Sequence, residues 1–211
     1  AVAAAGNRIH LATYAVATTA NTATAVQNST VDGHSGRSQT SAARRQANKE
    51  ASAILGFRDE YPRLADDKDR ARRIAPFTFT LEEFVHEEIK KGKISSSDFS
   101  DKKKTIKIHG HCHQKSLSNM ESSFAMLNLP KNYAVTIINS GCCGMAGSFG
   151  YEKEHYEVSM QVGEDTLFPK VRNTGKDVSI AASGTSCRHQ IFDGTGRKAL
   201  HPATILREAL K

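Results

Sequence analysis

The sequence has no tryptophan, few other aromatic residues and no apolar run long enough to cross a bilayer. Residues 1–5 are small and apolar, but they lack the charged start and the longer apolar stretch of a signal peptide. These absences predict a soluble chain without a transmembrane segment. We expect it in the cytoplasm, with peripheral attachment to a membrane as the alternative.

Several signature loops are also missing. No Gly-x-Gly-x-x-Gly or Walker-type loop stands between a predicted strand and helix, and Gly194-Thr-Gly196 is too short to count. A flavin that takes part in the function is therefore expected on a separate domain or chain. No Ser–His–acid arrangement can be argued from the sequence, so it identifies no catalytic residue.

The net charge of +7 does not indicate a nucleic-acid partner, because no aromatic side chains are interleaved with the basic ones. Acidic residues such as Glu87 and Glu88 stand close to the basic runs, which favours solvated helix faces. The alternative is a docking surface for an acidic redox partner, since opposite charges mainly accelerate association.

Bulky apolar residues are sparse in residues 1–50, which are rich in Ala, Thr, Asn, Ser and Gln. This composition is typical of a weakly folding segment or a linker. From residue 51 onward the sequence has the patterning of a globular protein. We expect strands at 105–109, 134–138 and 177–182, and helices at 64–74, 80–89, 114–127, 151–167 and 202–210.

The helix expected at 80–89 has the clearest local signals. Thr80 is a good N-cap, Glu83 completes a capping box three residues later, and Gly92 provides a stop. The alternation of strands and helices after residue 104 favours an α/β fold with a parallel sheet and helical crossovers.

Short matches between the two halves predict an internal repeat. Residues 32–38 resemble residues 143–149, Ser52-Ala53 corresponds to Ser186-Cys187, and the helix at 80–89 corresponds to the one at 202–210. We therefore expect two βα repeats related by a pseudo-twofold axis. Residues 1–100 would form a degenerate first repeat, and residues 101–211 a second repeat that carries the cysteines.

No cysteine occurs before residue 110, and the positions of the four that follow are informative. Cys112, the adjacent pair Cys142–Cys143, and Cys187 each come after a predicted strand. Because the ends of parallel strands share one edge of a sheet, we expect the four thiols to converge there. Clustered cysteines in a reducing compartment indicate metal binding or catalysis more often than disulfides.

Four thiolates suit either zinc or an iron–sulfur cluster. The sequence lacks the Cys-x-x-Cys knuckles of ordinary zinc fingers, and adjacent cysteines can serve a cluster whose irons are spread over several ångströms. A metal-free disulfide-exchange pair at Cys142–Cys143 is a third interpretation. His111, His113 and His189 are candidates for tuning a bound metal by hydrogen bonds to sulfur.

The cysteine motifs resemble the cysteine-rich CCG domain, in particular the C-terminal iron–sulfur module of FAD-linked oxidases of the D-lactate and D-2-hydroxyglutarate dehydrogenase type. The resemblance is strong over residues 50–211 and faint over 1–49. It rests on His109-Gly-His-Cys-His-Gln-Lys-Ser-Leu117, Asn139-Ser-Gly-Cys-Cys-Gly-Met-Ala-Gly-Ser-Phe-Gly150 and Ser183-Gly-Thr-Ser-Cys-Arg-His-Gln-Ile191, with support from residues 57–64 and 77–84.

This resemblance implies a two-repeat architecture, as in the heterodisulfide reductase B subunit and the iron–sulfur subunit of glycolate oxidase. It implies a [4Fe-4S]-type cluster, or zinc, held by Cys112, Cys142, Cys143 and Cys187. Gln190 stands where the family often has a further cysteine, and Ala53 where the first repeat usually has one. We thus expect an electron-transfer domain of a flavin-linked 2-hydroxyacid oxidoreductase. Its partners would be a flavoprotein domain or subunit, other iron–sulfur modules and an electron acceptor; a zinc-stabilised docking module is the alternative.

Overall fold

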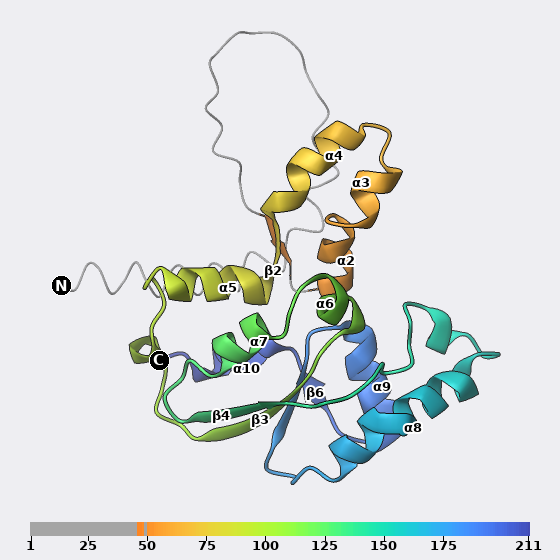
Figure 1. Ribbon diagram of the computed structural model, residues 1–211. Coiled ribbons are helices and arrows are strands. Elements are labelled where there is room, and N and C mark those ends of the chain that lie inside the picture. Colours follow the sequence, from red (N-terminus) through yellow and green to blue (C-terminus); the bar gives the residue numbers. More distant parts are fainter. Residues whose placement is uncertain (1–45, 49) are drawn as a thin grey trace.

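The computed structural model describes residues 46–48 and 50–211 (Figure 1). The motif at 32–38 lies outside these residues, as does most of the stretch expected to be a linker. The larger part is a four-stranded sheet with helices on both faces. A helical arm, residues 51–74, stands above it, with a two-stranded sheet at its base.

Every strand pair within the two sheets is parallel, with the order β4-β3-β5-β6 in the large sheet and β1-β2 in the small one. The strands are β1 (Gln46–Asn48), β2 (Thr78–Thr80), β3 (Lys104–His109), β4 (Tyr133–Ile137), β5 (Ser179–Ala182) and β6 (Ala199–Leu200). The α-helices are α2 (Ala51–Gly56), α3 (Glu60–Leu64), α4 (Lys68–Ile74), α5 (Leu81–Lys90), α6 (Cys112–Leu117), α7 (Glu121–Leu127), α8 (Tyr156–Arg172), α9 (Thr185–Thr195) and α10 (Pro202–Ala209). Three short 3₁₀ helices are η2 (Ala75–Phe77), η3 (Ser96–Asp98) and η4 (Phe149–Tyr151).

The large sheet separates two apolar cores because side chains alternate between its faces. Ile106 and Ile108 of β3 point into one core with residues of α5, α7 and α10. Ile180 and Ala182 of β5 point into the other, with residues of α8 and α9. The predicted α/β class with a parallel sheet and helical crossovers is therefore confirmed.

Element boundaries show where the local pattern was insufficient. The helix predicted at 114–127 is two helices, α6 and α7, separated at residues 118–120. The long helix predicted at 151–167 instead spans Tyr156–Arg172. Neither α9 nor β6 was predicted, because residues 183–200 show neither a clear apolar stripe nor a run of β-branched residues.

Parts of the two halves share a parallel strand pair followed by a helix. In the first half β1 leads through α2, α3, α4 and η2 to its partner β2 and then α5; at the end of the second, β5 leads through α9 to its partner β6 and then α10. Ala53 and Cys187 are each the third residue of the helix that follows the first of these strands. The halves also touch, because Glu50 Oε2 accepts hydrogen bonds from the backbone N–H and hydroxyl of Thr185 at 3.2 and 2.7 Å.

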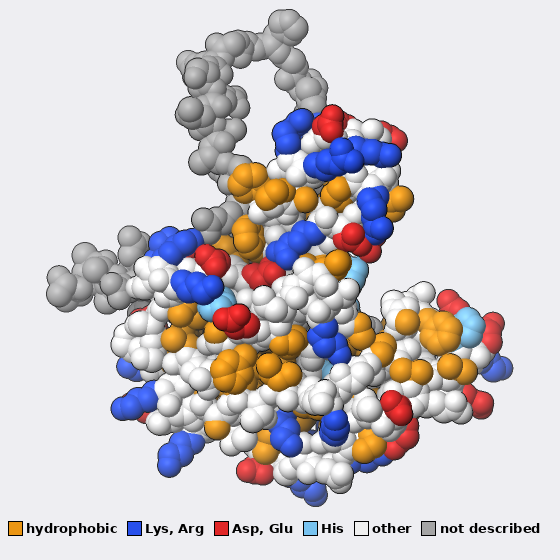
Figure 2. Space-filling view, in the orientation of Figure 1, with side chains coloured by type: hydrophobic (Ala, Val, Ile, Leu, Met, Phe, Trp, Pro, Cys, Tyr) orange, Lys and Arg blue, Asp and Glu red, His pale blue; other side chains and the backbone are white. Residues whose placement is uncertain are grey.

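Charged side chains on the visible surface are mixed in sign. Lys and Arg side chains gather over α3 and α4 with acidic side chains among them (Figure 2), and ion pairs such as Arg63–Asp59 and Arg72–Asp69 join them. No helix in the described part of the chain is long and apolar enough to cross a membrane.

The start of α5 is the best-defined helix end. Thr80 Oγ1 accepts from the backbone N–H of Glu83 at 3.2 Å, and Glu83 Oε2 accepts from the N–H of Thr80 at 2.8 Å, which confirms the predicted capping box. Arg58 forms a salt bridge to the same Glu83 and also donates to the Thr78 carbonyl, so it joins the arm to α5.

Glu82, in the first turn of α5, is fully buried beside His201, whose Nε2 lies 4.0 Å from Glu82 Oε1. Burial raises the pKa of Glu82 to about 7, against the smaller opposing effect of hydrogen bonds from its own backbone and from Thr80. The folded protein therefore holds a proton on this carboxyl that an unfolded chain, with an ordinary carboxyl pKa, releases at a lower pH.

We predict that this proton makes stability fall as the pH rises. Between about pH 5 and pH 7 the folded state binds more protons at Glu82 than the unfolded state, so its contribution is present at low pH and is lost through this range. The loss should be about 3 kcal/mol. Glu82→Gln, which stays neutral, should lack this decline when the free energy of unfolding is measured by urea denaturation at each pH.

Glu87→Gln is the matched control, because Glu87 lies on the same helix but pairs with Lys90 at the surface. It should keep the pH dependence of the unmodified chain. Parallel pH profiles for Glu82→Gln and the unmodified chain would contradict the prediction.

Candidate metal centre

Three strands of the large sheet end at one edge, as the sequence predicted. Ile108 of β3 pairs with Ile137, the last residue of β4, and His109 pairs with Ala182, the last residue of β5. The segments that leave these strands carry all four cysteines of the chain. Cys112 begins α6, Cys142–Cys143 lie in the loop after β4, and Cys187 lies in the first turn of α9.

The four thiols interact with one another. Cys142 is the neighbour that most strongly shifts the pKa values of Cys112 and Cys143, and the sulfur atoms of Cys143 and Cys187 lie within 4.8 Å of each other. Cys143 and Cys187 are buried, whereas Cys112 and Cys142 are partly exposed. One end of the cluster is therefore enclosed in the protein and the other approaches solvent.

These contacts push the thiol pKa values in opposite directions. The interactions with Cys112 and Cys143 lower the pKa of Cys142 far below its usual range, and the neighbouring Cys143, followed by the nearby His109, lowers that of Cys187 to about 5. The pKa values of Cys112 and Cys143 are strongly raised, first by their contact with Cys142.

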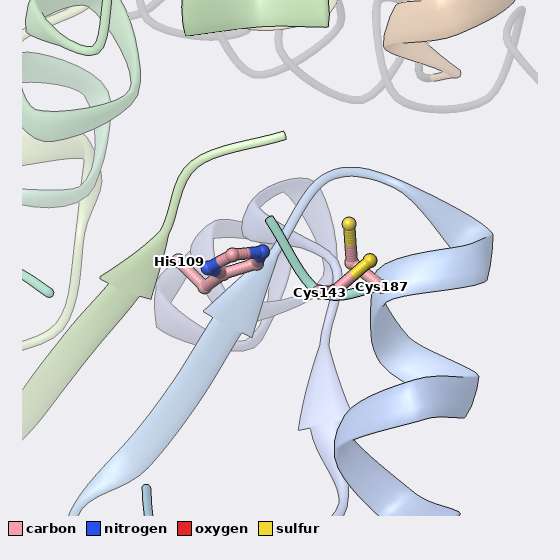
Figure 3. Close-up of side chains that lie close together, drawn as sticks. All are labelled: His109, Cys143 and Cys187. Atoms are coloured by element: carbon pink, nitrogen blue, oxygen red, sulfur yellow. The ribbon is translucent and has the colours of Figure 1, made fainter. Parts of the chain in front are cut away.

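His109 completes the buried end of the site. It is the last residue of β3 and is fully buried, and one of its ring nitrogens lies within 4.8 Å of the sulfur atoms of Cys143 and Cys187, which are themselves within 4.8 Å of each other. Figure 3 shows the ring at the end of its strand, directed toward the two thiols. Its Nδ1 lies 2.8 Å from Ser140 Oγ.

The side chains at this edge fit a bound metal. Thiolate sulfur and imidazole nitrogen are the donors preferred by zinc and by iron–sulfur clusters. Among the described residues, Nε2 of His109 and Nδ1 of His111 are buried ring nitrogens without a hydrogen-bond partner that meets ordinary distance and angle limits. Buried polar atoms are normally satisfied, so orphaned nitrogens beside a thiol cluster favour a ligand at this position.

The loop that holds Cys142–Cys143 depends on backbone conformations that suit glycine. Gly144, Ala146 and Gly147 all have positive φ, at 101°, 39° and 74°. A Cβ on Gly144 would lie 2.0 Å from the carbonyl oxygen of Ser159, so this loop packs directly on α8. The N–H of Gly144 donates to the sulfur of Cys142 at 3.3 Å, which holds that sulfur in place.

Lys115 fixes the same loop from the other side. Its Nζ donates to the carbonyl oxygens of Ser140 and Gly141, both at 3.0 Å. This links the first helix after β3 to the loop after β4. The ammonium group also lowers the pKa of Cys112 by its charge, although the contact with Cys142 outweighs that effect.

The three predicted histidines lie in different surroundings. His111 packs over Gly184, where an added Cβ would lie 2.3 Å from its ring and 3.3 Å from the Cys187 sulfur. His113 Nε2 instead faces Glu60 at 3.4 Å, and the exposed His189 bonds through Nδ1 to the Tyr151 hydroxyl at 2.8 Å. The structure therefore brings His111 to the cysteines and turns His113 and His189 toward other partners.

Sequence reasoning missed His109 as a member of the site. The available signal was its place at the end of a strand whose buried residues, Ile106 and Ile108, alternate with it. That alternation sends His109 to the face that also carries Ala182, its partner in register.

The fold and site define an α/β domain with a cysteine-rich candidate metal centre at the carboxyl edge of a parallel sheet. The chain is similar to parts of named dehydrogenases. It is 30% identical over 105 residues to the C subunit of the anaerobic glycerol-3-phosphate dehydrogenase of Escherichia coli, covering 50% of this chain and 26% of that protein. It is 28% identical over 177 residues to the D-2-hydroxyglutarate dehydrogenase of Haemophilus influenzae, covering 75% of this chain and 15% of that protein.

A third relative is the D-2-hydroxyglutarate dehydrogenase of Pseudomonas putida, 32% identical over 107 residues, which are 48% of this chain and 10% of that protein. The chain thus spans about a quarter or less of the length of these three relatives. No protein-family model matches the sequence, and no solved structure gives a significant match. The relatives connect this chain with oxidoreductases, and its similarity is to one portion of each.

We predict that Gly144→Ala will displace the cysteine loop. The new methyl group would collide with the Ser159 carbonyl in addition to straining a backbone with φ of 101°, so the loss in free energy of unfolding should exceed the 1–2 kcal/mol or so typical of strain alone. Gly147→Ala is the matched control, since it also has positive φ but nothing lies within 4 Å of the position its methyl group would take. Urea denaturation should give Gly144→Ala a clearly lower free energy of unfolding than Gly147→Ala. Equal losses of stability in the two variants would show that the contact with α8 is unimportant.

Proposed function

We propose that this chain is an iron–sulfur electron-transfer domain of a flavin-linked 2-hydroxyacid oxidoreductase, with Cys112, Cys142, Cys143 and Cys187 as its metal ligands. The observation that supports this most directly is the position of all four cysteines after strands that end at one sheet edge, where the sulfur atoms of Cys143 and Cys187 lie within 4.8 Å of each other. A structural cysteine is commonly buried as a small apolar residue. Four cysteines that gather at one sheet edge, two of them partly exposed, are better explained as ligands.

A cluster of the [4Fe-4S] type would supply one-electron storage at this position. The protein would hold it between two rigid elements, since Cys112 and Cys187 lie in first turns of helices while Cys142–Cys143 lie in a loop fixed by Lys115 and Gly144. Buried Cys143 and Cys187 would keep water from the inner side. Partly exposed Cys112 and Cys142 would place the outer side where an electron partner can approach.

The relatives support electron transfer more than substrate recognition. Their names give two different substrates, glycerol-3-phosphate and D-2-hydroxyglutarate, although each is similar to part of this chain. A matched segment that is about a quarter or less of each relative suits a role independent of the substrate. We infer that flavin and substrate are bound by a separate flavoprotein domain or subunit, which passes electrons through this and other iron–sulfur modules to an acceptor.

We further propose that residues 1–100 and 101–211 are two repeats of one unit, of which the second alone binds metal. The parallel strand pair followed by a helix in each half, and the equivalent places of Ala53 and Cys187, support this division. Ala53 offers no ligand atom, so the first repeat would serve as support. Its contact from Glu50 to Thr185 reaches the start of the helix that carries Cys187.

A zinc-stabilised docking module without redox activity is the second candidate. The close grouping of His109, Cys143 and Cys187 favours it, because three donors within 4.8 Å of one another suit a single tetrahedral ion. Zinc would hold the same edge together and leave the protein colourless.

We predict that the full chain, prepared anaerobically, will be brown and will contain about four iron and four acid-labile sulfide per chain. Cys142→Ser should lose the colour and most of the iron, because this residue contacts both Cys112 and Cys143. Visible absorbance measures the colour, and assays of iron, zinc and sulfide on the same sample measure the metal and sulfide content.

Ser186→Ala is the control, since it alters the residue beside Cys187 but keeps all four thiols. It should retain iron and colour. A colourless chain with one zinc would favour the docking module. A chain without metal would reject both metal-binding functions and direct attention to thiol exchange at Cys142–Cys143.

A further inference from the structure

We propose that Nε2 of His109 is a direct ligand of the metal centre, which makes its donor set a mixture of imidazole and thiolates. This inference rests on the proposed metal-binding function. Because a [4Fe-4S] cluster or a zinc ion takes four protein ligands, His109 would take the place of one of the four thiolates. It starts from the position of His109, whose nitrogen closes a triangle with the sulfur atoms of Cys143 and Cys187 at separations within 4.8 Å.

The position of His109 in β3 fixes the face of the sheet on which its ring lies. Ile106 and Ile108 point into one core, so the alternation of β3 sends His109 to the opposite face, where Ala182 lies beside it in register. His109 is fully buried at the carboxyl end of the strand. It is held at the depth of Cys143 and Cys187, below the partly exposed pair Cys112 and Cys142.

The other ring nitrogen is already engaged, which orients the imidazole. Nδ1 of His109 lies 2.8 Å from Ser140 Oγ, and Ser140 is anchored in the loop after β4 by a Lys115 hydrogen bond to its carbonyl. Metal-bound histidines usually make such a bond through the second nitrogen, which fixes the ring orientation. A hydroxyl both donates and accepts, so Ser140 can stay bonded to Nδ1 whichever nitrogen carries the proton.

The remaining nitrogen has no adequate partner within the described part of the chain. Nε2 of His109 is buried without a hydrogen bond of ordinary geometry among the described residues. A nitrogen of the same ring lies within 4.8 Å of the sulfur atoms of Cys143 and Cys187. A structural histidine in a core normally satisfies both nitrogens. A cation placed between this nitrogen and the two sulfurs satisfies all three atoms at once.

An imidazole ligand changes the chemistry of the centre. It is neutral where a thiolate carries a negative charge, so a cluster with one histidine ligand is easier to reduce than one with thiolates alone. His109 would then set the reduction potential from the buried side, while the partly exposed cysteines face the partner.

The test uses the full chain, loaded anaerobically with Zn²⁺ alone and, separately, prepared with its iron. X-ray absorption at each metal edge distinguishes nitrogen ligands at about 2.0–2.1 Å from sulfur ligands at about 2.3 Å, and outer-shell scattering identifies an imidazole. We expect one imidazole in the ligand set. It should persist in His111→Asn and disappear in His109→Asn.

Competition with a chromophoric chelator measures the zinc affinity of the unmodified chain and of each variant. Ser140→Ala, which keeps the imidazole but removes its orienting hydroxyl, should weaken zinc binding about 10-fold or more. His86→Asn is the matched control, because His86 also contacts a serine through Nδ1, at 3.3 Å from Ser122 Oγ, but lies on α5. It should leave the affinity unchanged.

The outcomes separate this inference from the function on which it rests. An all-sulfur ligand set in the unmodified chain overturns the role of His109 and leaves the metal-binding function standing. A chain that takes up neither zinc nor iron overturns both. If His109→Asn fails to fold, the spectrum of His111→Asn decides: an imidazole that persists there supports His109 as the ligand, and one that is lost there overturns its role.

Discussion

The parallel alignment of β3, β4 and β5 is the constraint on which the rest of the site depends. Parallel strands place all their carboxyl ends at one edge, so the segments leaving them meet there however far apart they are in sequence. Cys112 and Cys187 are separated by a long stretch of chain that includes α8, yet both join one cluster. The two apolar cores on either side of the sheet keep this edge rigid.

A second constraint is electrostatic. Thiols in contact cannot all ionise without a cation, and the opposite pKa displacements of neighbouring cysteines express that conflict. Burial of Cys143, Cys187 and His109 increases the cost, because water cannot screen the charges. A metal ion would resolve the conflict by binding the thiolates directly, as the proposed function requires.

Polar contacts join the first half, including the arm, to the sheet edge that carries the cysteines. Glu50 accepts hydrogen bonds at the start of α9, and His113 of α6 faces Glu60 of α3. Arg58 and Ser118 both bind Glu83, which connects α2, α5 and the end of α6. The half without cysteines therefore supports the helices that carry Cys112 and Cys187, and this arrangement suits a degenerate repeat retained for its structural role.

The sequence by itself determined the fold class, the capped helix α5, and the convergence of strand ends that bear cysteine, because apolar periodicity, capping residues and parallel topology are local or follow from simple rules. It did not determine the break between α6 and α7, the helix around Cys187, or the separate surroundings of His111, His113 and His189. Above all, it did not identify His109 as part of the site. Which nitrogen and sulfur atoms share a buried space depends on strand register and on the packing of distant segments, and only the tertiary structure decided that.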